Sequence, residues 1–577
     1  MEYKKINKES ISNNVIEEFF MNRGFKKEDI FHYLNTTDED ILAPELLDNM
    51  EQGAKMLLDC IANNKKIFVI PDVDADGFTS ASILINYIFA MNPSFAKENI
   101  EYEINEGKTH GIILDNIPDD VSLVICPDSG SSDYEEHSHL KELGIDVLVL
   151  DHHELTNGVS SNACVINNQA CDYPNKTLSG AGVVYKFCCY LDKINGTKYA
   201  DNFLDLTALG LISDMVSLKD FETRHLVKKG LQNIRNPFFK TMSKKNSFSL
   251  GDTLTPMGIA FYITPYINAT IRMGSKSEKR TLFESMLDFK AYENIPSTKR
   301  GCKGQEETRV EQACRNCTNI KNRQTRARDA SLIRIEELIS KENLLDNKLL
   351  IIPLPKTLDF DKNLTGLIAN QLMAKYQKPT LLLREEEEFS GSARGIGNSE
   401  FNNFKQFIEN TNLFSLAQGH AQAFGASIPK DNLQEFINLS NNLLEYCDFK
   451  PCYNADFIFN GDDFKGADIL AIAELEPLFG QGVEEPYVVI ENLSVTKDNL
   501  TLMSRDKNPT LKIQLQNGCS LIRFKSSEEE FEKLYSNLGC VKINVVGRCR
   551  QNVWNGTTTP QVIIEDYEIV EKQSYYF

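Results

Sequence analysis

Residues 67–77 read Ile-Phe-Val-Ile-Pro-Asp-Val-Asp-Ala-Asp-Gly, a short apolar run followed by three aspartates at alternate positions and a glycine. Two further apolar runs end in the same way, Leu123–Cys126 before Pro127-Asp128 and Val147–Leu150 before Asp151. Short apolar runs that alternate with helical stretches are typical of buried strands in a parallel α/β sheet. The sequence therefore predicts such a sheet, with an acidic residue at the carboxyl end of each strand.

The three aspartates after the first run, Asp72, Asp74 and Asp76, predict a site for a divalent cation. Carboxylates this close in a partly buried turn repel one another strongly unless cations compensate their charge. Their oxygen atoms are the ligands that hard cations such as Mg²⁺ and Mn²⁺ prefer. Gly77 allows a tight turn into the helix expected near Thr79, whose N-terminus could also hold a phosphate. Taken alone, the motif also fits a calcium-binding loop or a solvated acidic loop.

Three more acidic motifs have the same character. Asp128-Ser129-Gly130 and Asp151-His152-His153 follow the next two strands, and Asp214 interrupts the apolar segment 211–216. The chain has only eight histidines, so an adjacent pair at a strand end is a selective signal. Imidazole beside carboxylate favours a transition metal such as Mn²⁺ over Ca²⁺. A lone buried aspartate such as Asp214 is costly unless it is paired or coordinated.

The expected arrangement of these motifs predicts their chemistry. In an open parallel sheet the carboxyl ends of the strands line one crevice, where ligands bind. Folding would gather five or six carboxylates and two imidazoles around that cavity. This density suits two metal ions bridged by one carboxylate and an activated water. The sequence thus predicts hydrolysis of a phosphoester, in which the metals polarise the phosphoryl group and lower the pKa of the water.

The composition is that of a soluble globular protein. The chain has 577 residues, of which 41% are hydrophobic and 25% charged, which excludes a wholly disordered, collagen-like or fibrous protein. No apolar run approaches the roughly 18 residues of a membrane-spanning helix, and the first residues lack the apolar core of a secretory signal. The fourteen cysteines show no regular pairing, so we expect reduced thiols in a cytoplasmic protein. Cys314 and Cys317 have zinc-like spacing, but too few further ligands accompany them to favour a zinc site.

The charge is strongly acidic, with 62 Lys and Arg against 82 Asp and Glu, a net of −20. Such a chain is not an obvious partner for nucleic acid, because phosphate contacts rely on Lys and Arg. The window 299–328 is a local exception, with nine basic and three acidic residues. It predicts either a solvated helix face or a path for nucleic acid, and charge alone does not choose between them.

The acidic motifs together resemble those of the DHH phosphoesterase superfamily: Asp72–Gly77, Asp128–Gly130, Asp151–His153 and Gly210–Asp214. Further motifs resemble those of the RecJ single-strand exonuclease family and occur in the same order. They are Ser179–Gly182, Pro265–Gly274, Gly391–Arg394, Gln418–Gly425 and Asn552–Gly556. The resemblance runs from about residue 15 to the C-terminus.

The resemblance implies an α/β fold class: a parallel-sheet DHH domain, a smaller α/β DHHA1 domain joined to it by a helical connector, and a C-terminal OB-like β-barrel. The expected segments are an N-terminal helical segment (1–48), the DHH metal-binding domain (49–235), the connector (236–346), the DHHA1 substrate domain (347–447) and the OB-like nucleic-acid-binding domain (448–577). The alternating pattern after Tyr453 independently predicts an all-β barrel or sandwich.

The resemblance also implies 5′→3′ degradation of single-stranded DNA, dependent on two divalent metal ions, Mn²⁺ or Mg²⁺, in DNA repair, recombination or replication. The implied metal ligands are Asp72, Asp74, Asp76, Asp128, His152 and Asp214. Asp128 would bridge the metals, and His153 would act with it as a catalytic residue. The implied substrate contacts are Asn268, Arg272, Ser392, Arg394 and His420. We expect a monomer that binds single-stranded DNA and no membrane, with a single-strand-binding protein or a helicase as candidate protein partners.

The chain departs from the family at two places. Gln418-Gly419 replaces a glycine pair, and Phe424 replaces a usually small residue, so the shape of the substrate groove is expected to differ. Family members tend to have an aromatic residue near His110, where His110 and Lys108 could instead contact phosphate. Trp554, the only tryptophan, is expected to be a packed barrel residue, although a base could stack on it.

Two other functions remain open from the sequence. One is a phosphodiesterase for short oligonucleotides or cyclic dinucleotides. The other is a non-catalytic replication scaffold, which predicts eroded metal motifs, whereas all four motifs here retain their acids and histidines.

Overall fold

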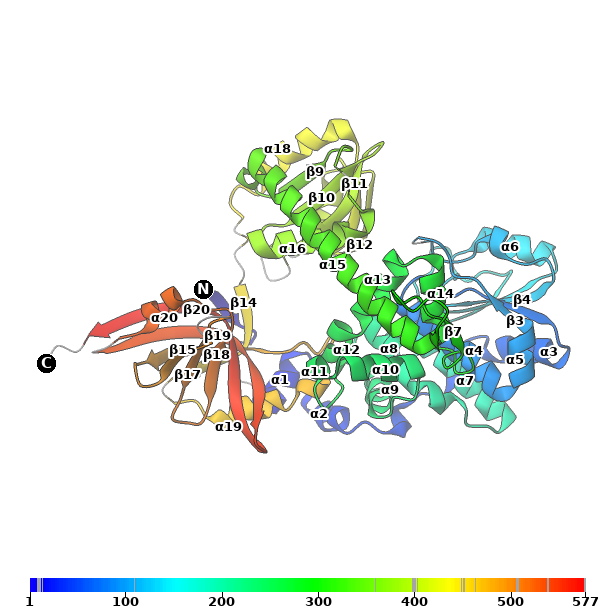
Figure 1. Cartoon of the computed structure of the whole chain (residues 1–577), viewed down its shortest axis with the longest axis horizontal. Coiled ribbons are helices and arrows are strands. Elements are labelled where there is room, and N and C mark those ends of the chain that lie inside the picture. Colours follow the sequence, from blue (N-terminus) through cyan, green and yellow to red (C-terminus); the bar gives the residue numbers. More distant parts are fainter. Residues whose placement is uncertain are drawn as a thin grey trace. The chain divides into compact units, whose positions relative to one another are not determined.

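The chain folds into two compact units in the computed structural model. Figure 1 colours the chain from its N-terminus to its C-terminus. The α/β unit comprises residues 25–322 and 476–485, and the two-sheet unit comprises residues 1–24, 323–475 and 486–577. The structure describes residues 1–7, 12, 14–107, 109–358, 360–396, 401, 403–447, 449, 452–461, 463–504, 508–536 and 539–574.

A five-stranded parallel sheet organises the α/β unit. Its strands lie in the order β3-β2-β4-β5-β6, and every neighbouring pair is parallel. Their bounds are β2 Lys66–Val69, β3 Ile100–Tyr102, β4 Val121–Pro127, β5 Asp146–Asp151 and β6 Cys164–Asn167. The predicted parallel α/β sheet is confirmed, and the three acidic strand ends belong to the adjacent strands β2, β4 and β5.

Helices surround this sheet and continue beyond it. They are α2 Lys27–Leu34, α3 Met50–Ala62, α4 Ala75–Met91, α5 Pro93–Asn99, α6 Tyr134–Glu142, α7 Gly180–Asn195, α8 Leu204–Ser213, α9 Phe221–Gln232, α10 Pro237–Lys245, α11 Ser247–Leu250, α12 Pro256–Tyr262, α13 Thr264–Met273 and α14 Lys276–Ser285. Helix α15 (Arg309–Lys341) begins in the α/β unit and ends in the two-sheet unit.

Both faces of the parallel sheet are covered, which explains why its strands read as nearly continuous apolar runs. On one face Val124 and Val149 share a buried cluster with Leu140 of α6. On the other face Leu148 lies against Gly53 of α3, where an added Cβ would come within 2.9 Å of the leucine side chain. Close approach of α3 therefore requires the glycine.

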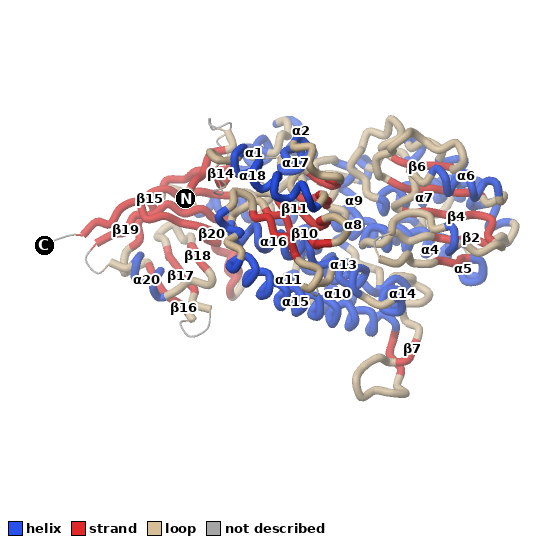
Figure 2. The backbone as a smooth tube through the Cα atoms, turned by 90° about the horizontal axis from the view of Figure 1, so that it is seen from above, coloured by secondary structure: helices blue, strands red, loops and turns tan. Residues whose placement is uncertain are grey.

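The predicted helical connector also contains a hairpin that the sequence did not reveal. Its strands are β7 (Asn294–Pro296) and β8 (Glu306–Thr308), which pair antiparallel. Figure 2 shows β7 and the loop that follows it projecting from the helices. Each strand has only three residues, too few for an alternating pattern to be recognised.

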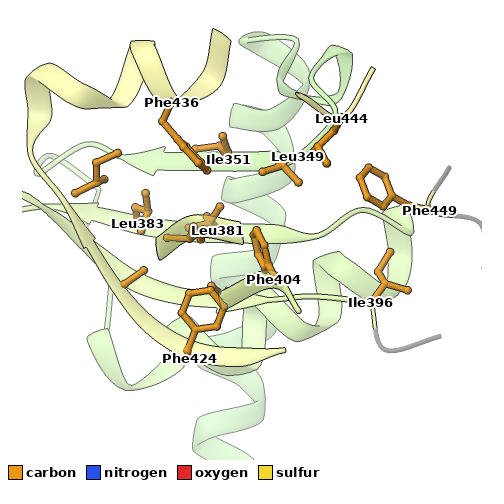
Figure 3. Packing of buried hydrophobic residues seen from close by; sticks show 14 residues of the cluster. Leu349, Ile351, Leu381, Leu383, Ile396, Phe404, Phe424, Phe436, Leu444 and Phe449 are labelled. Atoms are coloured by element: carbon orange, nitrogen blue, oxygen red, sulfur yellow. The ribbon is translucent and has the colours of Figure 1, made fainter. Parts of the chain in front are cut away.

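The first sheet of the two-sheet unit has the strand order β12-β13-β11-β10-β9. Its strands are β9 Leu350–Leu354, β10 Thr380–Glu385, β11 Phe389–Arg394, β12 Leu416–His420 and β13 Ala423–Ile428, and its helices are α16 Thr365–Tyr376, α17 Phe404–Asn410 and α18 Leu433–Leu443. One face of this sheet forms a core in which Leu381 and Leu383 pack with Phe404 of α17 and Phe436 of α18 (Figure 3).

The second sheet of this unit has eight strands in the order β1-β14-β15-β19-β20-β18-β17-β16. Their bounds are β1 Glu2–Lys5, β14 Cys452–Asn460, β15 Tyr487–Val495, β16 Leu500–Met503, β17 Thr510–Gln514, β18 Ser520–Arg523, β19 Gly539–Trp554 and β20 Thr557–Ser574, and the unit also holds α1 Val15–Asn22, α19 Gly466–Ala473 and α20 Glu528–Leu534. The predicted β-rich C-terminal region is confirmed.

The N-terminal segment is not wholly helical, so that part of the prediction is wrong. Residues Glu2–Lys5 form β1, which pairs parallel with β14, and the Tyr3 hydroxyl donates a hydrogen bond of 2.6 Å to Glu491. This edge strand is half exposed and mostly polar. Its burial pattern arises only from residues more than 400 positions away, which local periodicity cannot show.

Strands β19 and β20 form a long hairpin whose turn is Asn555-Gly556. Both turn residues have positive φ, 48° and 76°, the requirement of a two-residue type I′ hairpin. The side chain of Trp554, beside the turn, is 74% exposed, and that of Val553 is 63% exposed. The expectation that Trp554 packs inside a barrel is therefore wrong, because its strand extends to a hairpin end that no other element covers among the described residues.

Two further features of the fold are the state of its cysteines and the length of its apolar helices. All fourteen cysteines are free. Cys314 and Cys317 are buried in α15. Among the residues that the structure describes, no helix is both long and apolar enough to cross a membrane.

Candidate metal centre

The candidate centre begins where β2, β4 and β5 end, because these neighbouring parallel strands deliver their following residues to one edge of the sheet. Asp72 follows β2, Asp128 follows β4 and His152 follows β5. Asp72 and Asp128 are each 1% exposed. Asp128 has a φ of +69°, a conformation that costs energy in any residue with a Cβ and that aspartate tolerates better than most. A strained residue at a strand end is a common sign of a functional site.

The start of α4 supplies the next two carboxylates. Asp74 caps the helix, and its Oδ1 accepts a hydrogen bond of 2.9 Å from the backbone N–H of Gly77. Asp76 points to the start of α7, where the hydroxyl of Ser179 and the backbone N–H groups of Gly180 and Ala181 donate to it at 2.9, 2.7 and 3.2 Å. The N-terminus of α7 therefore fixes a carboxylate, which its helix dipole favours.

Glycines allow the elements around these carboxylates to come together. A Cβ on Gly180 would lie 2.3 Å from Asp128 Oδ1, and a Cβ on Gly210 would lie 2.3 Å from Asp76 Oδ1. Gly210 belongs to α8, which places Asp214 at its C-terminal end. The motif Ser179–Gly182 was found in the sequence only by resemblance; its role as a carboxylate clamp required the structure.

His152 lies between two of the carboxylates. Its Nε2 is 3.2 Å from Asp128 Oδ1 and 3.6 Å from Asp214 Oδ2. Burial, reinforced by the charge of His153, lowers the pKa of His152 to about 4. The imidazole is therefore uncharged at neutral pH, and these contacts are not ion pairs. A neutral imidazole with a free lone pair is a metal ligand.

The geometry fits divalent cations. Three sets of side chains each bring ligand atoms within 4.8 Å of one another: Asp72 with Asp74 and Asp128; Asp76 with His152 and Asp214; and Asp128 with Asp151, His152 and His153. Asp72 Oδ1, Asp128 Oδ1 and His152 Nε2 are buried without a hydrogen-bond partner. Buried polar atoms are normally satisfied, so convergent orphan acceptors need a cation or a proton. Carboxylates with one or two imidazoles suit Mn²⁺ and Mg²⁺.

The electrostatics of the cluster agree with this interpretation. Burial and the charge of Asp74 raise the pKa of Asp76 to about 6. Burial and the charge of Asp76 raise the pKa of Asp214 to about 8. The same two causes raise the pKa of Asp128 well above its usual range. Without cations Asp214 holds a proton at neutral pH, and a bound dication would replace that proton.

Asp151 organises the two histidines. Its Oδ1 accepts hydrogen bonds from the backbone N–H of His152 at 2.7 Å and from Nδ1 of His153 at 2.8 Å, and its Oδ2 accepts one from the backbone N–H of Ser131 at 3.1 Å. Burial would raise the pKa of Asp151, but these hydrogen bonds, that of His153 first, lower it below its usual value. The hydrogen bond to Asp151 raises the pKa of His153 to about 9.

The predicted substrate residues divide between the two units. Asn268 and Arg272 lie on α13 of the α/β unit, where Arg272 is exposed and Asn268 half buried. Within the described residues, no hydrogen bond or ion pair joins either side chain to the carboxylates. Ser392, Arg394 and His420 lie in the two-sheet unit.

These last three residues belong to one side of the five-stranded sheet in the two-sheet unit. Arg394 and His420 both pair with Ala423 on the strand between them, so they point to the same face. The Ser392 hydroxyl donates a hydrogen bond of 3.1 Å to Thr365 at the start of α16. A cationic side chain, a hydroxyl and a helix N-terminus together suit a phosphate.

Phe424 does not shape this face, contrary to the expectation. Its side chain is 3% exposed and lies in the core on the opposite face, 5.5 Å from Phe404 between ring centroids. Lys108, the other residue expected to contact phosphate, lies outside the described residues.

The basic window 299–328 is partly neutralised by acids close to it. Arg309 pairs with Glu284 and with Glu293, and Arg315 pairs with Glu307. These contacts favour a structural role for part of the window, at the base of the hairpin β7–β8.

The raised pKa values predict how stability responds to Mg²⁺ and pH. The pKa of Asp214 is raised in the folded protein, so its contribution to stability is complete below about pH 4 and is lost as the pH rises through 8. The pKa of His153 is also raised in the folded protein, so its contribution to stability is complete below its usual pKa and is lost as the pH rises through about 9. Metal-free protein should therefore be less stable at pH 8 than at pH 6.5, and Mg²⁺ should restore stability more at pH 8.

Thermal unfolding by calorimetry checks this expectation. At saturating Mg²⁺ the midpoint should rise by about 5 °C or more at pH 8, and by less at pH 6.5. Asp214→Asn should remove most of the difference. An equal rise at both pH values would contradict the proton competition inferred here.

Comparison with known proteins finds two of the expected domain types, the DHH domain and the OB domain. Residues 66–211 match the DHH family, N-terminal domain, and residues 455–566 match the RecJ OB domain. The chain is 36% identical to YorK, an SPbeta prophage-derived protein of Bacillus subtilis named as a single-strand DNA-specific exonuclease, over 99% of this chain and 98% of YorK. It is 25% identical to the Bacillus subtilis single-stranded-DNA-specific exonuclease RecJ, over 97% of this chain and 69% of RecJ.

Solved structures share the fold. RecJ from Thermus thermophilus in complex with Mn²⁺ has a TM-score of 0.68 and 19% identity, covering 96% of this chain and 78% of that one. The Mg²⁺ complex of the same protein has a TM-score of 0.64 at 17% identity and covers 96% of this chain and 74% of that one. At this level of identity the likeness concerns the fold.

Proposed function

Because the chain belongs to the RecJ family of DHH phosphoesterases, we propose that it is an exonuclease specific for single-stranded DNA. It would cleave phosphodiester bonds from the 5′ end and depend on two divalent ions, Mn²⁺ or Mg²⁺. The observation that carries the proposal is the convergence of buried, partnerless carboxylate and imidazole atoms at one edge of the parallel sheet. The names of the relatives supply the substrate. The proposed setting is DNA repair, recombination or replication.

We assign the cation ligands to six of the residues whose ligand atoms converge. They are Asp72, Asp74, Asp76, Asp128, His152 and Asp214. Asp128 is the proposed bridge, because it is the one carboxylate that belongs to two of the three sets of close ligand atoms among the described residues, and one of its oxygens has no partner. Divalent cations, when bound, polarise the phosphoryl group and lower the pKa of an attacking water.

The protein's own groups orient this chemistry. The N-terminus of α7 holds Asp76, and the turn with positive φ fixes the direction of Asp128. His153 is proposed as the catalytic histidine. Its hydrogen bond to Asp151 keeps it protonated at neutral pH, because the pKa is raised to about 9. Its exposed imidazolium can donate a hydrogen bond to a phosphoryl oxygen as negative charge develops there.

We propose that substrate phosphates contact the remaining predicted residues. In the two-sheet unit these are Ser392, Arg394 and His420, which share one face of a sheet with the start of α16. An arginine can hold a phosphate with two parallel hydrogen bonds. Asn268 and Arg272 of α13 are the proposed contacts within the α/β unit.

Digestion of end-labelled oligonucleotides tests the proposal. With Mn²⁺, a 5′ label on a single strand should appear as the smallest products from the first time point, while a 3′-labelled strand shortens gradually. Duplex DNA and samples with chelator should stay intact. The reverse pattern of labels would overturn the polarity, and an inert protein with bound Mn²⁺ would overturn the activity.

Two rival functions predict different results. A phosphodiesterase for short oligonucleotides or cyclic dinucleotides would lose activity as strands lengthen, so a length series distinguishes it. A replication scaffold would bind DNA without cleaving it. The eight-stranded sheet that matches the RecJ OB domain favours a longer polymer, and the retained acids and imidazoles favour catalysis.

Trp554 offers a direct test of whether the hairpin β19–β20 contacts the strand. It is the only tryptophan and is 74% exposed, and stacking of a base on an aromatic ring is worth about 1–3 kcal/mol. Adding single-stranded DNA to chelated protein should quench its fluorescence. Trp554→Ala should weaken binding by about tenfold, whereas Trp554→Phe should retain most of the affinity. Unchanged fluorescence at saturating DNA would remove this hairpin from the proposed path.

A further inference from the structure

An exposed histidine, His110, contacts the buried carboxylate of Asp72. Its Nδ1 lies 2.6 Å from Asp72 Oδ2, and the His110 side chain is 58% exposed while that of Asp72 is 1% exposed. The second oxygen, Asp72 Oδ1, is buried without a hydrogen-bond partner. One oxygen of the carboxylate is therefore engaged by the imidazole and the other has no hydrogen-bond partner, while Asp72 shares a set of close ligand atoms with Asp74 and Asp128.

The loop that carries His110 is built to hold it in place. Asn105, which is 2% exposed, donates hydrogen bonds from Nδ2 to the backbone carbonyl of Thr109 at 3.2 Å and to that of Gly111 at 2.9 Å. These two carbonyls belong to the residues on either side of His110. A single buried amide thus closes the loop around the histidine.

A second clamp fixes the far side of the same loop. Asp133 accepts a hydrogen bond of 2.8 Å from the backbone N–H of Ile112. Gly111 has a φ of +77°, and a Cβ there would lie 2.3 Å from Asp133 Oδ2. Exposed loops ordinarily tolerate changes of sequence better than the rest of a fold. Hydrogen bonds that fix this loop on both sides of His110 therefore indicate that the position of the His110 side chain matters.

We propose that His110 is a positioning residue, which fixes the Asp72 carboxylate by donating a hydrogen bond from Nδ1 and thereby raises the affinity of the centre for divalent cations. This inference rests on the proposed function, because it takes Asp72 as a cation ligand. Carboxylates that bind metals commonly accept hydrogen bonds from neighbouring groups, and loss of such a donor typically lowers the metal affinity about 10- to 100-fold.

Binding of Mn²⁺ to the full-length protein tests the inference. Electron paramagnetic resonance of free Mn²⁺ gives the affinity without DNA and without turnover. His110→Phe, which lacks a donor, should bind Mn²⁺ about 10- to 100-fold more weakly than wild type. His110→Asn places an N–H donor near the position of Nδ1 and should bind Mn²⁺ nearly as well as wild type. His139→Phe, at an exposed position of α6, is the matched control and should not change the affinity.

A variant of the loop clamp provides a second route to the same answer. Asn105→Ala should weaken Mn²⁺ binding in the same direction as His110→Phe. The double variant should lose little more than the single ones, because both changes release the same carboxylate. Fully additive losses of Mn²⁺ affinity in the double variant would show that the two changes act independently, and would overturn the inference.

Activity measurements separate this role from a direct contact with DNA. If His110 holds Asp72, raising the Mn²⁺ concentration should restore most of the rate of His110→Phe while KM for DNA stays near the wild-type value. An unchanged Mn²⁺ affinity in His110→Phe, or an equal loss in His110→Asn, would overturn the inference. Should wild-type protein not cleave DNA at all, the proposed function would fail, but the Mn²⁺ affinities would still decide the role of His110.

Discussion

Asp128→Asn is expected to lower the rate of DNA cleavage by about a thousandfold or more, because bound dications supply several kcal/mol of stabilisation to the transition state. Asparagine is the informative replacement. It keeps the shape of aspartate and tolerates the left-handed backbone, where φ is +69°. Alanine would add backbone strain to the loss of the carboxylate. The variant removes one charge from the cluster and should leave the fold intact.

The same variant should be more stable than wild type when no metal is present. Burial and the charge of Asp76 raise the pKa of Asp128 well above its usual range, so at pH 8 the wild-type carboxylate destabilises the folded state. A neutral amide removes this cost. Asp119→Asn, an exposed position in the same unit, is the control for charge alone. A rate near that of wild type in Asp128→Asn would contradict the assignment of Asp128 as the bridge.

Gly180→Ala is expected to lower the cleavage rate by about a hundredfold, the loss typical of a catalytic group displaced by about 1 Å. A Cβ at this position would lie 2.3 Å from Asp128 Oδ1 and 2.5 Å from Asp128 Cβ. The Cβ of Asp128 is fixed to the backbone and cannot rotate away, so α7 or the turn at Asp128 must move. The same substitution would disturb the N–H group that donates to Asp76 at 2.7 Å.

Gly182→Ala, on the same helix, provides the matched control. Its nearest neighbours would be two carbons of the Leu178 side chain, at 3.1 and 3.2 Å, and a shift of a few tenths of an ångström relieves both contacts. We expect folded protein with a rate close to that of wild type. Steady-state rates and Mn²⁺ affinities of the two variants should therefore differ sharply, and equal rates would show that the approach of α7 to Asp128 is not required.

The centre was predictable because its signals are local in the sequence and its assembly follows from a general rule. Asp72, Asp128 and His152 each follow an apolar run, and parallel strands that are neighbours must bring their carboxyl ends together. The motif around Gly210 was visible, but only the structure explains its glycine, which lets α8 approach the Asp76 carboxylate. The parallel sheet of the α/β unit follows from the same apolar patterns.

The parts that escaped prediction depend on contacts distant in the chain. Strand β1 pairs with residues 452–455, and a short polar segment gives no indication of the strand with which it pairs. Trp554 was expected to be buried because tryptophan usually is, whereas the hairpin carries it to an exposed end. The clamp on Asp76 from the start of α7 joins residues more than 100 positions apart. The amide of Asn105 is local in sequence, but asparagine is common in loops and gave no signal.

The most direct test of the account is to locate Mn²⁺ in crystals of the full chain by anomalous scattering. We predict two peaks at the edge of the parallel sheet, one contacting Asp72, Asp74 and Asp128 and the other contacting Asp76, Asp128, His152 and Asp214. Asp128→Asn should lose at least one of them. Crystals soaked in Mn²⁺ that show no peak among these carboxylates, or peaks only elsewhere, would contradict the claim that folding gathers them into a cation-binding centre.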